Sequence, residues 1–341
     1  MRRSYQVLIL IFSILGPALA DDARIRQLFR ETDRVTRADV AGIQKKAASG
    51  DVRSELMLGA LYSDRDDLFD VDVGDGRLEG MKWYRRAAET GNTDGAILLG
   101  EGLLFTDSVQ ARFWLERAAL TDDHDAQYDI GLLYYNDQYF PHDYSKAFMW
   151  FKKAAEGGHS TAEFWTGYMY DCGSGTAQND AEAARWYKLA AAAGEWAAQY
   201  NLAQMYEEGR GVERSVLKAV YWYKKAAQRQ IADAAYELGV IYTERKEIAN
   251  PALATRWFRI ARSEYLEAAK LGDRDAEVAL GCLYESGRGV PKNLVTAYKW
   301  YRLASQSNRA YEDLARVKGK MTLAQIQKGE DLALEWRTRI R

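Results

Sequence analysis

The residues best suited to chemistry lie in an acidic stretch at 63–79, SDRDDLFDVDVGDGRLE. Carboxylate oxygens among glycines are the ligands that Ca²⁺ prefers, and the stretch supplies six aspartates: Asp64, Asp66, Asp67, Asp70, Asp72 and Asp75. A helix–loop–helix calcium site, however, needs a glutamate at its twelfth position. Counting from Asp70 places Met81 there. We therefore expect a flexible solvated loop, and the sequence leaves open whether it binds a cation.

The other reactive side chains form no catalytic or metal-binding pattern. Three histidines occur, without an H-E-x-x-H motif or a cysteine–histidine cluster: His124, His142 and His159. Neither a zinc site nor a nucleophilic triad is indicated, and we expect solvated turn residues. The G-x-G motifs at 173–175, 209–211 and 287–289 follow no strand and precede no G-K-[ST], so they predict turns and not phosphate sites. The sequence thus predicts no catalytic residues, no metal and no cofactor.

The elements that carry these residues repeat along the chain. Seven tryptophans recur 31 to 43 residues apart, at Trp83, Trp114, Trp150, Trp186, Trp222, Trp257 and Trp300. Each follows a small residue, at Gly59, Gly100, Gly131, Gly167, Ala203, Gly239 and Gly281. An aromatic residue or leucine stands three positions after the small one, as in Tyr206. A small residue lets two helices approach closely, and we expect this aromatic side chain to fill the groove beside it.

One such helix pair cannot bury its apolar face alone, whereas stacked neighbours supply the missing surface. The sequence therefore predicts an all-α superhelical solenoid of stacked antiparallel helix pairs. We expect N-terminal capping helices in 21–50, about seven repeats in 51–310 and a C-terminal capping helix in 311–341. In the sixth repeat, seven extra residues within 263–271 predict a helix longer by two turns. The final helix is expected to begin with a capping box at Thr322 and Gln325 and to cover the last repeat with Ile326, Leu332, Leu334 and Trp336.

The units resemble Sel-one-like repeats, relatives of tetratricopeptide repeats. Their pattern is A-x-Y-x-L-G-x-x-Y, then G-x-G-V, then A-x-x-W-Y-x-x-A-A, and it is matched best at 198–227 and 276–304. The resemblance covers about 38–310 and implies a binding scaffold whose concave face holds a protein or peptide. A cysteine-rich branch of the family pairs cysteines within each unit and is linked to β-lactam binding or hydrolysis.

Cys172 and Cys282 are not paired in that way, because they lie in the fourth and seventh units. Stacked helix pairs advance by roughly 9 Å per layer, whereas a disulfide spans about 7 Å between α-carbons. We expect two buried packing cysteines, with their redox state left open. A cell-envelope enzyme of the β-lactam or peptidoglycan hydrolase type is the alternative function.

The chain starts with the features of a secretory signal. Residues 1–20 combine Arg2 and Arg3 with an apolar run and an Ala18-Leu19-Ala20 ending, which predicts cleavage before Asp21. The run is shorter than the ~20 residues that span a bilayer, so no membrane span is expected after cleavage. The absence of an N-x-S/T sequon favours the bacterial periplasm, with secretion as the alternative.

The charge balance disfavours nucleic-acid binding. The chain has 47 basic and 49 acidic residues, and no basic stripe is evident along the sequence. We therefore expect a non-catalytic exported scaffold that binds a protein or peptide partner.

The partner-binding surface is expected on the concave face formed by the first helices. Residues two before and one after each small position differ between repeats, and six of them are predicted to contact the partner: Asp129, Trp165, Tyr168, Asn201, Gln204 and Glu237. Trp165 and Tyr168 would be aromatic anchors. The alternative is that these side chains only pack against neighbouring repeats. The identity of the partner, the biological process, the source organism and the oligomeric state are not determined by the sequence.

Overall fold

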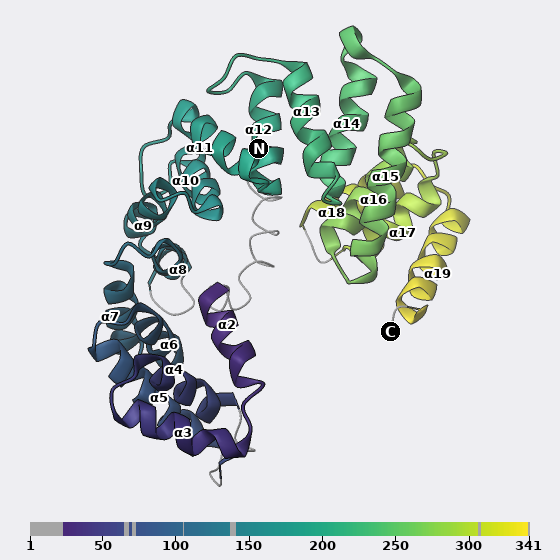
Figure 1. Cartoon of the computed structure of the whole chain (residues 1–341). Helices are drawn as coiled ribbons and strands as arrows, with labels where there is room; N and C mark the ends of the chain where they lie inside the picture. Colours follow the sequence, from purple (N-terminus) through teal and green to yellow (C-terminus); the bar gives the residue numbers. More distant parts are fainter. Residues whose placement is uncertain are drawn as a thin grey trace. The chain divides into compact units, whose positions relative to one another are not determined.

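The computed structural model describes residues 23–64, 68–69, 73–104, 106–136, 141–305 and 308–339. The predicted signal segment and most of the acidic stretch lie outside these residues. Every regular element within the described ranges is a helix, as Figure 1 shows. The chain divides into two units, Met1–Glu195 and Trp196–Arg341. The prediction of an all-α solenoid of stacked helix pairs is confirmed.

The first unit contains two leading helices and four helix pairs. The leading helices are α2 (Ala23–Thr32) and α3 (Arg37–Ala48), which pack on the first pair. The pairs follow one another along the chain in Figure 1: α4 (Val52–Asp64) with α5 (Val73–Glu89), α6 (Thr93–Leu103) with α7 (Ser108–Ala119), α8 (His124–Tyr135) with α9 (Tyr144–Glu156), and α10 (Ser160–Cys172) with α11 (Asp180–Ala193). The second half of the acidic stretch is therefore the start of α5, where a loop was expected.

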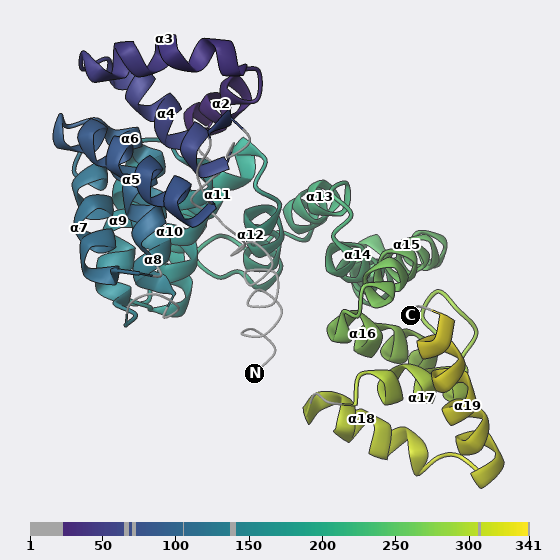
Figure 2. The same ribbon diagram turned by 90° about the horizontal axis from the view of Figure 1, so that it is seen from below.

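The second unit contains three helix pairs and two closing helices, visible in Figure 2. They are α12 (Trp196–Glu208) with α13 (Val216–Ala227), α14 (Ala232–Glu244) with α15 (Pro251–Lys270), α16 (Arg274–Ser286) with α17 (Leu294–Leu303), then α18 (Asn308–Lys318) and α19 (Leu323–Arg339). A short 3-10 turn, η3 (Lys246–Ile248), precedes α15. The 20 residues of α15 confirm that the insertion lengthens this helix.

Side-chain caps and turn glycines fix where the helices begin and end. Asp123 accepts hydrogen bonds from the backbone N–H groups of Asp125 and Ala126 at 3.1 and 3.0 Å, and so caps α8. Such caps satisfy donors that have no partner inside the helix. After α10, Gly173 has φ 69°, a left-handed conformation that favours glycine. The G-x-G motifs are therefore turns, as predicted.

The small residue of each first helix lies against the residue that follows the tryptophan. A Cβ atom added to Gly131 would lie 2.7 Å from the ring of Phe151, and one added to Gly167 would lie 2.8 Å from that of Tyr187. The tyrosine three positions after the small residue was expected to fill the groove beside it, and three of these tyrosines are buried, with 2% to 8% exposed: Tyr134, Tyr206 and Tyr242. The tryptophan and its successor face different neighbours, because adjacent helix positions are about 100° apart.

The C-terminal end differs in part from its prediction. The capping box is present, with Thr322 N–H donating to Gln325 Oε1 at 2.9 Å and Gln325 N–H donating to Thr322 Oγ1 at 3.3 Å. Two helices, α18 and α19, occur where one was expected. Trp336 lies edge-on to Trp300, with centroids 4.9 Å apart, whereas Leu334 is 66% exposed and does not cover the last repeat. Leu334 lies on the opposite face of α19 from Gly329 and Ala333, which are buried.

Candidate binding surface

The six residues predicted to bind a partner lie on first helices, three in each unit. Four of them expose between 1% and 9% of their surface: Asp129, Trp165, Tyr168 and Asn201. The indole of Trp165 stacks on Phe151 of the preceding repeat, with centroids 5.3 Å apart and ring planes at 12°. The expectation that Trp165 and Tyr168 are anchors open to a partner is therefore wrong. Both rings pack between repeats because the neighbouring helix pair covers them.

The remaining two residues, Gln204 and Glu237, are half-buried on α12 and α14 of the second unit. Gln204 Nε2 donates to the hydroxyl of Tyr200 at 3.3 Å. Burial raises the pKa of Tyr200 well above its usual value, and the carboxylates of Asp233 and Glu237 add to the shift. Tyr200 therefore stays neutral, and its hydroxyl supports the polar side chain of Gln204. The partner-binding role of this surface stays a prediction.

Carboxylates at the ends of the first helices of the second unit pair with arginines of the next repeat along the chain. Glu207 of α12 bonds Arg245 at 2.7 Å, and Glu244 of α14 bonds Arg288 at 3.1 Å. Arg288 also donates to the hydroxyl of Tyr236 at 2.5 Å. These pairs join successive repeats, and as exposed or half-exposed ion pairs each contributes about 0–1 kcal/mol.

Charge is divided between the two helices of each repeat. The seven first helices contain sixteen acidic and two basic residues. The seven second helices contain nine acidic and twenty basic residues. No basic stripe is evident along the sequence because acidic first helices and basic second helices alternate, so their charges cancel. The fold separates them, since each helix pair places its two members on different sides of the stack.

A solvent-facing ridge on the second helices of the first unit combines apolar and basic side chains. It consists of the residues five before, one before and three after each tryptophan, which share one helix face because their spacing is four. Five of its twelve members are large and apolar, with 44% to 64% exposed: Leu78, Val109, Phe113, Met149 and Leu189. Five are basic: Lys82, Arg86, Arg117, Lys153 and Arg185. Ser145 and Ala181 complete this second-helix ridge, and none of its members is acidic.

Four of the five basic members of the ridge lie against neighbouring tryptophans: Arg86, Arg117, Lys153 and Arg185. Arg86 also pairs with the buried Glu55 at 3.1 Å. The guanidinium of Arg117 lies 5.4 Å from the Trp114 ring centroid, and that of Arg185 lies 4.2 Å from Trp186. Such cation–π contacts keep a long side chain extended over the aromatic ring. The ridge could be read from the sequence only after the tryptophans are used to align the repeats.

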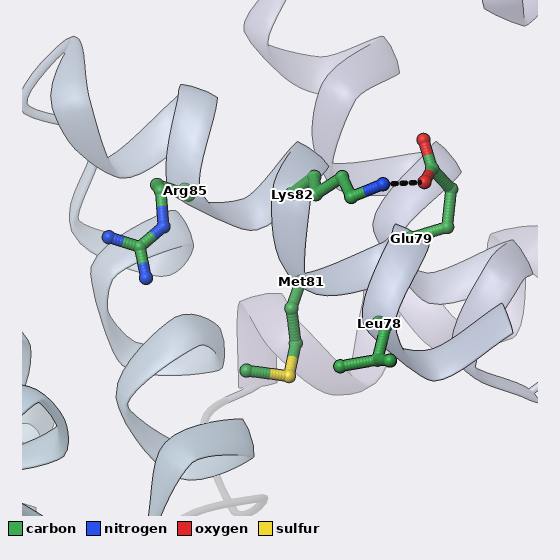
Figure 3. Close-up of a pocket in the computed structure, with 5 residues that line it drawn as sticks. All are labelled: Leu78, Glu79, Met81, Lys82 and Arg85. Carbon is green, nitrogen blue, oxygen red and sulfur yellow. Dashed lines mark hydrogen bonds and ion pairs between the residues drawn. The ribbon is translucent and has the colours of Figure 1, made fainter. Parts of the chain in front are cut away.

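A shallow depression of about 460 Å³ lies on α5 beside the start of the ridge. It is lined by Leu78, Glu79, Met81, Lys82 and Arg85. Figure 3 shows Leu78 and Met81 pointing to one side while Lys82 reaches Glu79 on the other, at 2.6 Å. All five residues come from one helix, so the depression is part of an open surface and not an enclosed ligand site.

The structure corrects the placement of the cysteines and of two histidines. Cys172 is exposed and Cys282 is half-buried, where two buried thiols were expected. The hydroxyl of Tyr301 lies 3.3 Å from Cys282 Sγ. His124 is half-buried, and His159 exposes only 18% of its side chain. Only His142 is exposed, as predicted for a turn.

His159 has a structural role at the junction of two repeats. Its Nδ1 accepts from the N–H of Ala162 at 3.1 Å and so caps α10. Its Nε2 faces Asp125 at 3.4 Å, and its ring stacks on Tyr128. Burial lowers the pKa of His159, against the opposing effect of Asp125. The described part of the chain holds no group of three or more His, Cys, Asp or Glu side chains that could bind a metal ion.

None of the described helices is long and apolar enough to cross a membrane. This finding concerns the described residues alone, and the predicted signal segment is outside them.

The repeat pattern matches a known family over most of the chain. The Sel1 repeat matches seven segments: 52–92, 95–121, 124–159, 160–195, 196–230, 232–264 and 274–308. The chain therefore belongs to the Sel1 repeat family, as the resemblance predicted. Proteins of this family are helical-repeat scaffolds that typically take part in protein interactions.

The chain is also similar to proteins of known structure. A Sel1 repeat protein from Oxalobacter formigenes shares 28% identity with a TM-score of 0.64, covering 88% of this chain and 93% of its own. A protective antigen of uropathogenic Escherichia coli that displays the same repeat fold shares 22% identity with a TM-score of 0.32, covering 87% and 94%. An immunity protein from Pseudomonas aeruginosa shares 18% with a TM-score of 0.36, covering 66% and 81%. No curated protein matches the chain.

Proposed function

We propose that this protein is a non-catalytic, exported scaffold that holds a protein or peptide partner on the face formed by its first helices. The observation that carries the proposal is the charge of this face in the second unit. Its three first helices contain eight acidic residues and one basic residue. Of the eight, Glu207 and Glu244 pair with arginines and Glu277 is buried. Gln204 and Glu237 are half-buried there. A face of this kind favours a partner with basic groups, because complementary charge speeds encounter and excludes acidic competitors.

The side chains of this face are held in place before any partner binds. Glu207 is fixed by Arg245 at 2.7 Å, and the hydroxyl of Tyr265 bonds Asp233. Burial and the adjacent Asp233 raise the pKa of Tyr265 well above its usual value, so the hydroxyl stays neutral and donates this bond. A preorganised polar face loses less conformational entropy on binding than a flexible one.

Export is part of the proposal and rests on the sequence of residues 1–20, with its basic start, apolar run and Ala-Leu-Ala ending. We propose the bacterial periplasm as the compartment, with secretion as the alternative. N-terminal sequencing of the protein recovered from its own cells tests this directly. A start at Asp21 supports export with cleavage, whereas an intact Met1 contradicts it.

The partner is tested by capture of the tagged mature protein and mass spectrometry, followed by affinity measurement with each purified partner. A Gln204→Arg/Glu237→Arg variant is compared with Phe113→Gln/Met149→Gln, which changes the ridge of the other unit. We expect the first variant to weaken binding at least about tenfold and the second to have no effect. Equal affinity for all three proteins would show that the binding face is elsewhere. Circular dichroism first establishes that each variant is folded.

A further inference from the structure

We propose that the second-helix ridge of the first unit is a docking surface for an anionic lipid membrane. The partner is the headgroup region of a bilayer containing acidic phospholipids. This inference does not rest on the proposed function, because it concerns the opposite helices of each repeat and a different kind of partner.

The ridge exposes large apolar side chains and contains no acidic residue. The five large apolar side chains of the ridge are at least 44% exposed, and none of the twelve positions is acidic. Exposed apolar side chains that recur at the same helix position in successive repeats are a candidate interaction surface. Figure 1 shows α7, α9 and α11 following one another along one side of the first unit. The ridge positions therefore recur on successive second helices.

Apolar and basic side chains of the ridge lie one helical turn apart. On α7, Phe113 lies one turn from Arg117, and on α9, Met149 lies one turn from Lys153. The core of a protein–protein interface is depleted in lysine, whereas arginine is enriched there. Lys82 and Lys153, each one turn from an apolar side chain, therefore suit a bilayer surface, where Leu, Phe and Met enter the acyl boundary and Lys or Arg reaches the phosphates.

The second helices of the first unit have a net positive charge, whereas its first helices have a net negative charge. The four second helices of the first unit contain eleven basic and seven acidic residues, whereas its four first helices contain one basic and eight acidic residues. Lys82 and Arg185 each pair with a glutamate one turn earlier, at 2.6 and 3.0 Å. Such exposed pairs are weak, so both cations can turn to a phosphate. An anionic surface attracts this side of the unit and repels the other.

The shape of the ridge is consistent with a fluid partner. The depression beside Leu78 is shallow and is formed by one helix, so the ridge is an open surface at this place. Lipid headgroups adapt to such a surface without requiring shape complementarity. A folded acidic protein would need a closer geometric match.

The test is flotation of the mature full-length protein with vesicles. Vesicles of phosphatidylcholine and phosphatidylglycerol in equal parts are compared with vesicles of phosphatidylcholine alone, each at low and at physiological ionic strength. We expect binding to the mixed vesicles that weakens with salt, and little binding to the neutral ones. Phe113→Gln/Met149→Gln should lower the partition coefficient at least about tenfold.

The matched control is Leu271→Gln/Leu323→Gln, which removes two apolar side chains that are 91% and 86% exposed but lie outside the ridge. It should bind like the parent protein. No flotation with the anionic vesicles, or equal loss in both variants, would overturn the proposal. If the ridge variant instead abolishes a dimer seen by light scattering and vesicles do not bind, the occupant is a second copy of the chain and the membrane proposal fails.

Discussion

The indole of Trp165 and the ring of Phe151 form a stacked pair that joins two successive repeats, 5.3 Å apart and nearly parallel at 12°. Phe151 in turn lies over Gly131 of its own repeat. The ring of Phe151 thus contacts Gly131 within its own repeat and Trp165 of the next repeat. This contact explains why Trp165 is buried although its position differs between repeats.

Replacing Trp165 by alanine should destabilise the protein strongly. Trp165 is 1% exposed, and removing a buried tryptophan costs about 3–5 kcal/mol through lost contacts and a cavity. The urea midpoint by circular dichroism measures the effect. Met149→Ala in α9 is the control, because Met149 is 51% exposed and the change should stay within about 0.5 kcal/mol. Equal midpoints for the two variants would contradict the packing role.

Two glycine-to-alanine changes should have opposite signs. At Gly167 the new methyl group would lie 2.8 Å from Tyr187 and 3.3 Å from the carbonyl of Ala183, so overpacking should cost about 1–3 kcal/mol. At Gly42, in α3, nothing lies within 4 Å of the new methyl group. Alanine there should stabilise by up to about 1 kcal/mol, because it is the better helix former. Thermal unfolding of the two variants tests the contrast, and a loss of stability at both sites would refute it.

Stability should fall as the pH rises from about 4.5 to about 7. Burial raises the pKa of Glu277 from 4.5 to about 7, against the opposing charges of Arg337, Arg274 and Lys299. The folded state therefore holds a proton that the unfolded chain releases in this range, and above it the buried carboxylate must be charged. Burial shifts the pKa of Glu264 in the same direction, also to about 7.

The variant Glu277→Gln keeps the shape but cannot ionise. The difference in melting temperature between pH 5 and pH 8 should therefore be smaller than in the parent protein. The exposed Glu267→Gln serves as the control and should keep the parent's pH dependence. An unchanged pH dependence in Glu277→Gln would show that this carboxyl group titrates normally.

Introducing a charge under the C-terminal helices should disrupt the end of the array. Val317 is 0% exposed in the cluster with Tyr301 and Ala310, so Val317→Asp places an unpaired carboxylate among apolar groups and should cost more than about 3 kcal/mol. Size-exclusion chromatography should show aggregation as the last repeat loses its cover. Leu334→Asp, at a position 66% exposed, should remain monodisperse. Identical elution of both variants would argue against a capping role.

The sequence by itself determined the repeat, its period and its helix pairs. The tryptophans, such as Trp150, recur every 31 to 43 residues because every helix pair meets the same packing problem. The turn glycines recur because glycine accepts a positive φ at no steric cost. The extra turns of α15 were also predictable, since seven inserted residues keep the apolar face in register.

Only the tertiary structure decided which side chains face solvent. Trp165 and Glu237 belong to the same series of variable first-helix positions, yet Trp165 is buried and Glu237 is half-buried. Exposure depends on what the neighbouring helix pair places against each residue, as Phe151 of the preceding repeat lies against Trp165. Helical periodicity describes the faces of one helix and carries no information about contacts with another repeat. The separation of acidic first helices from basic second helices was likewise hidden, because charges that alternate along the chain become two surfaces only when the helix pairs stack.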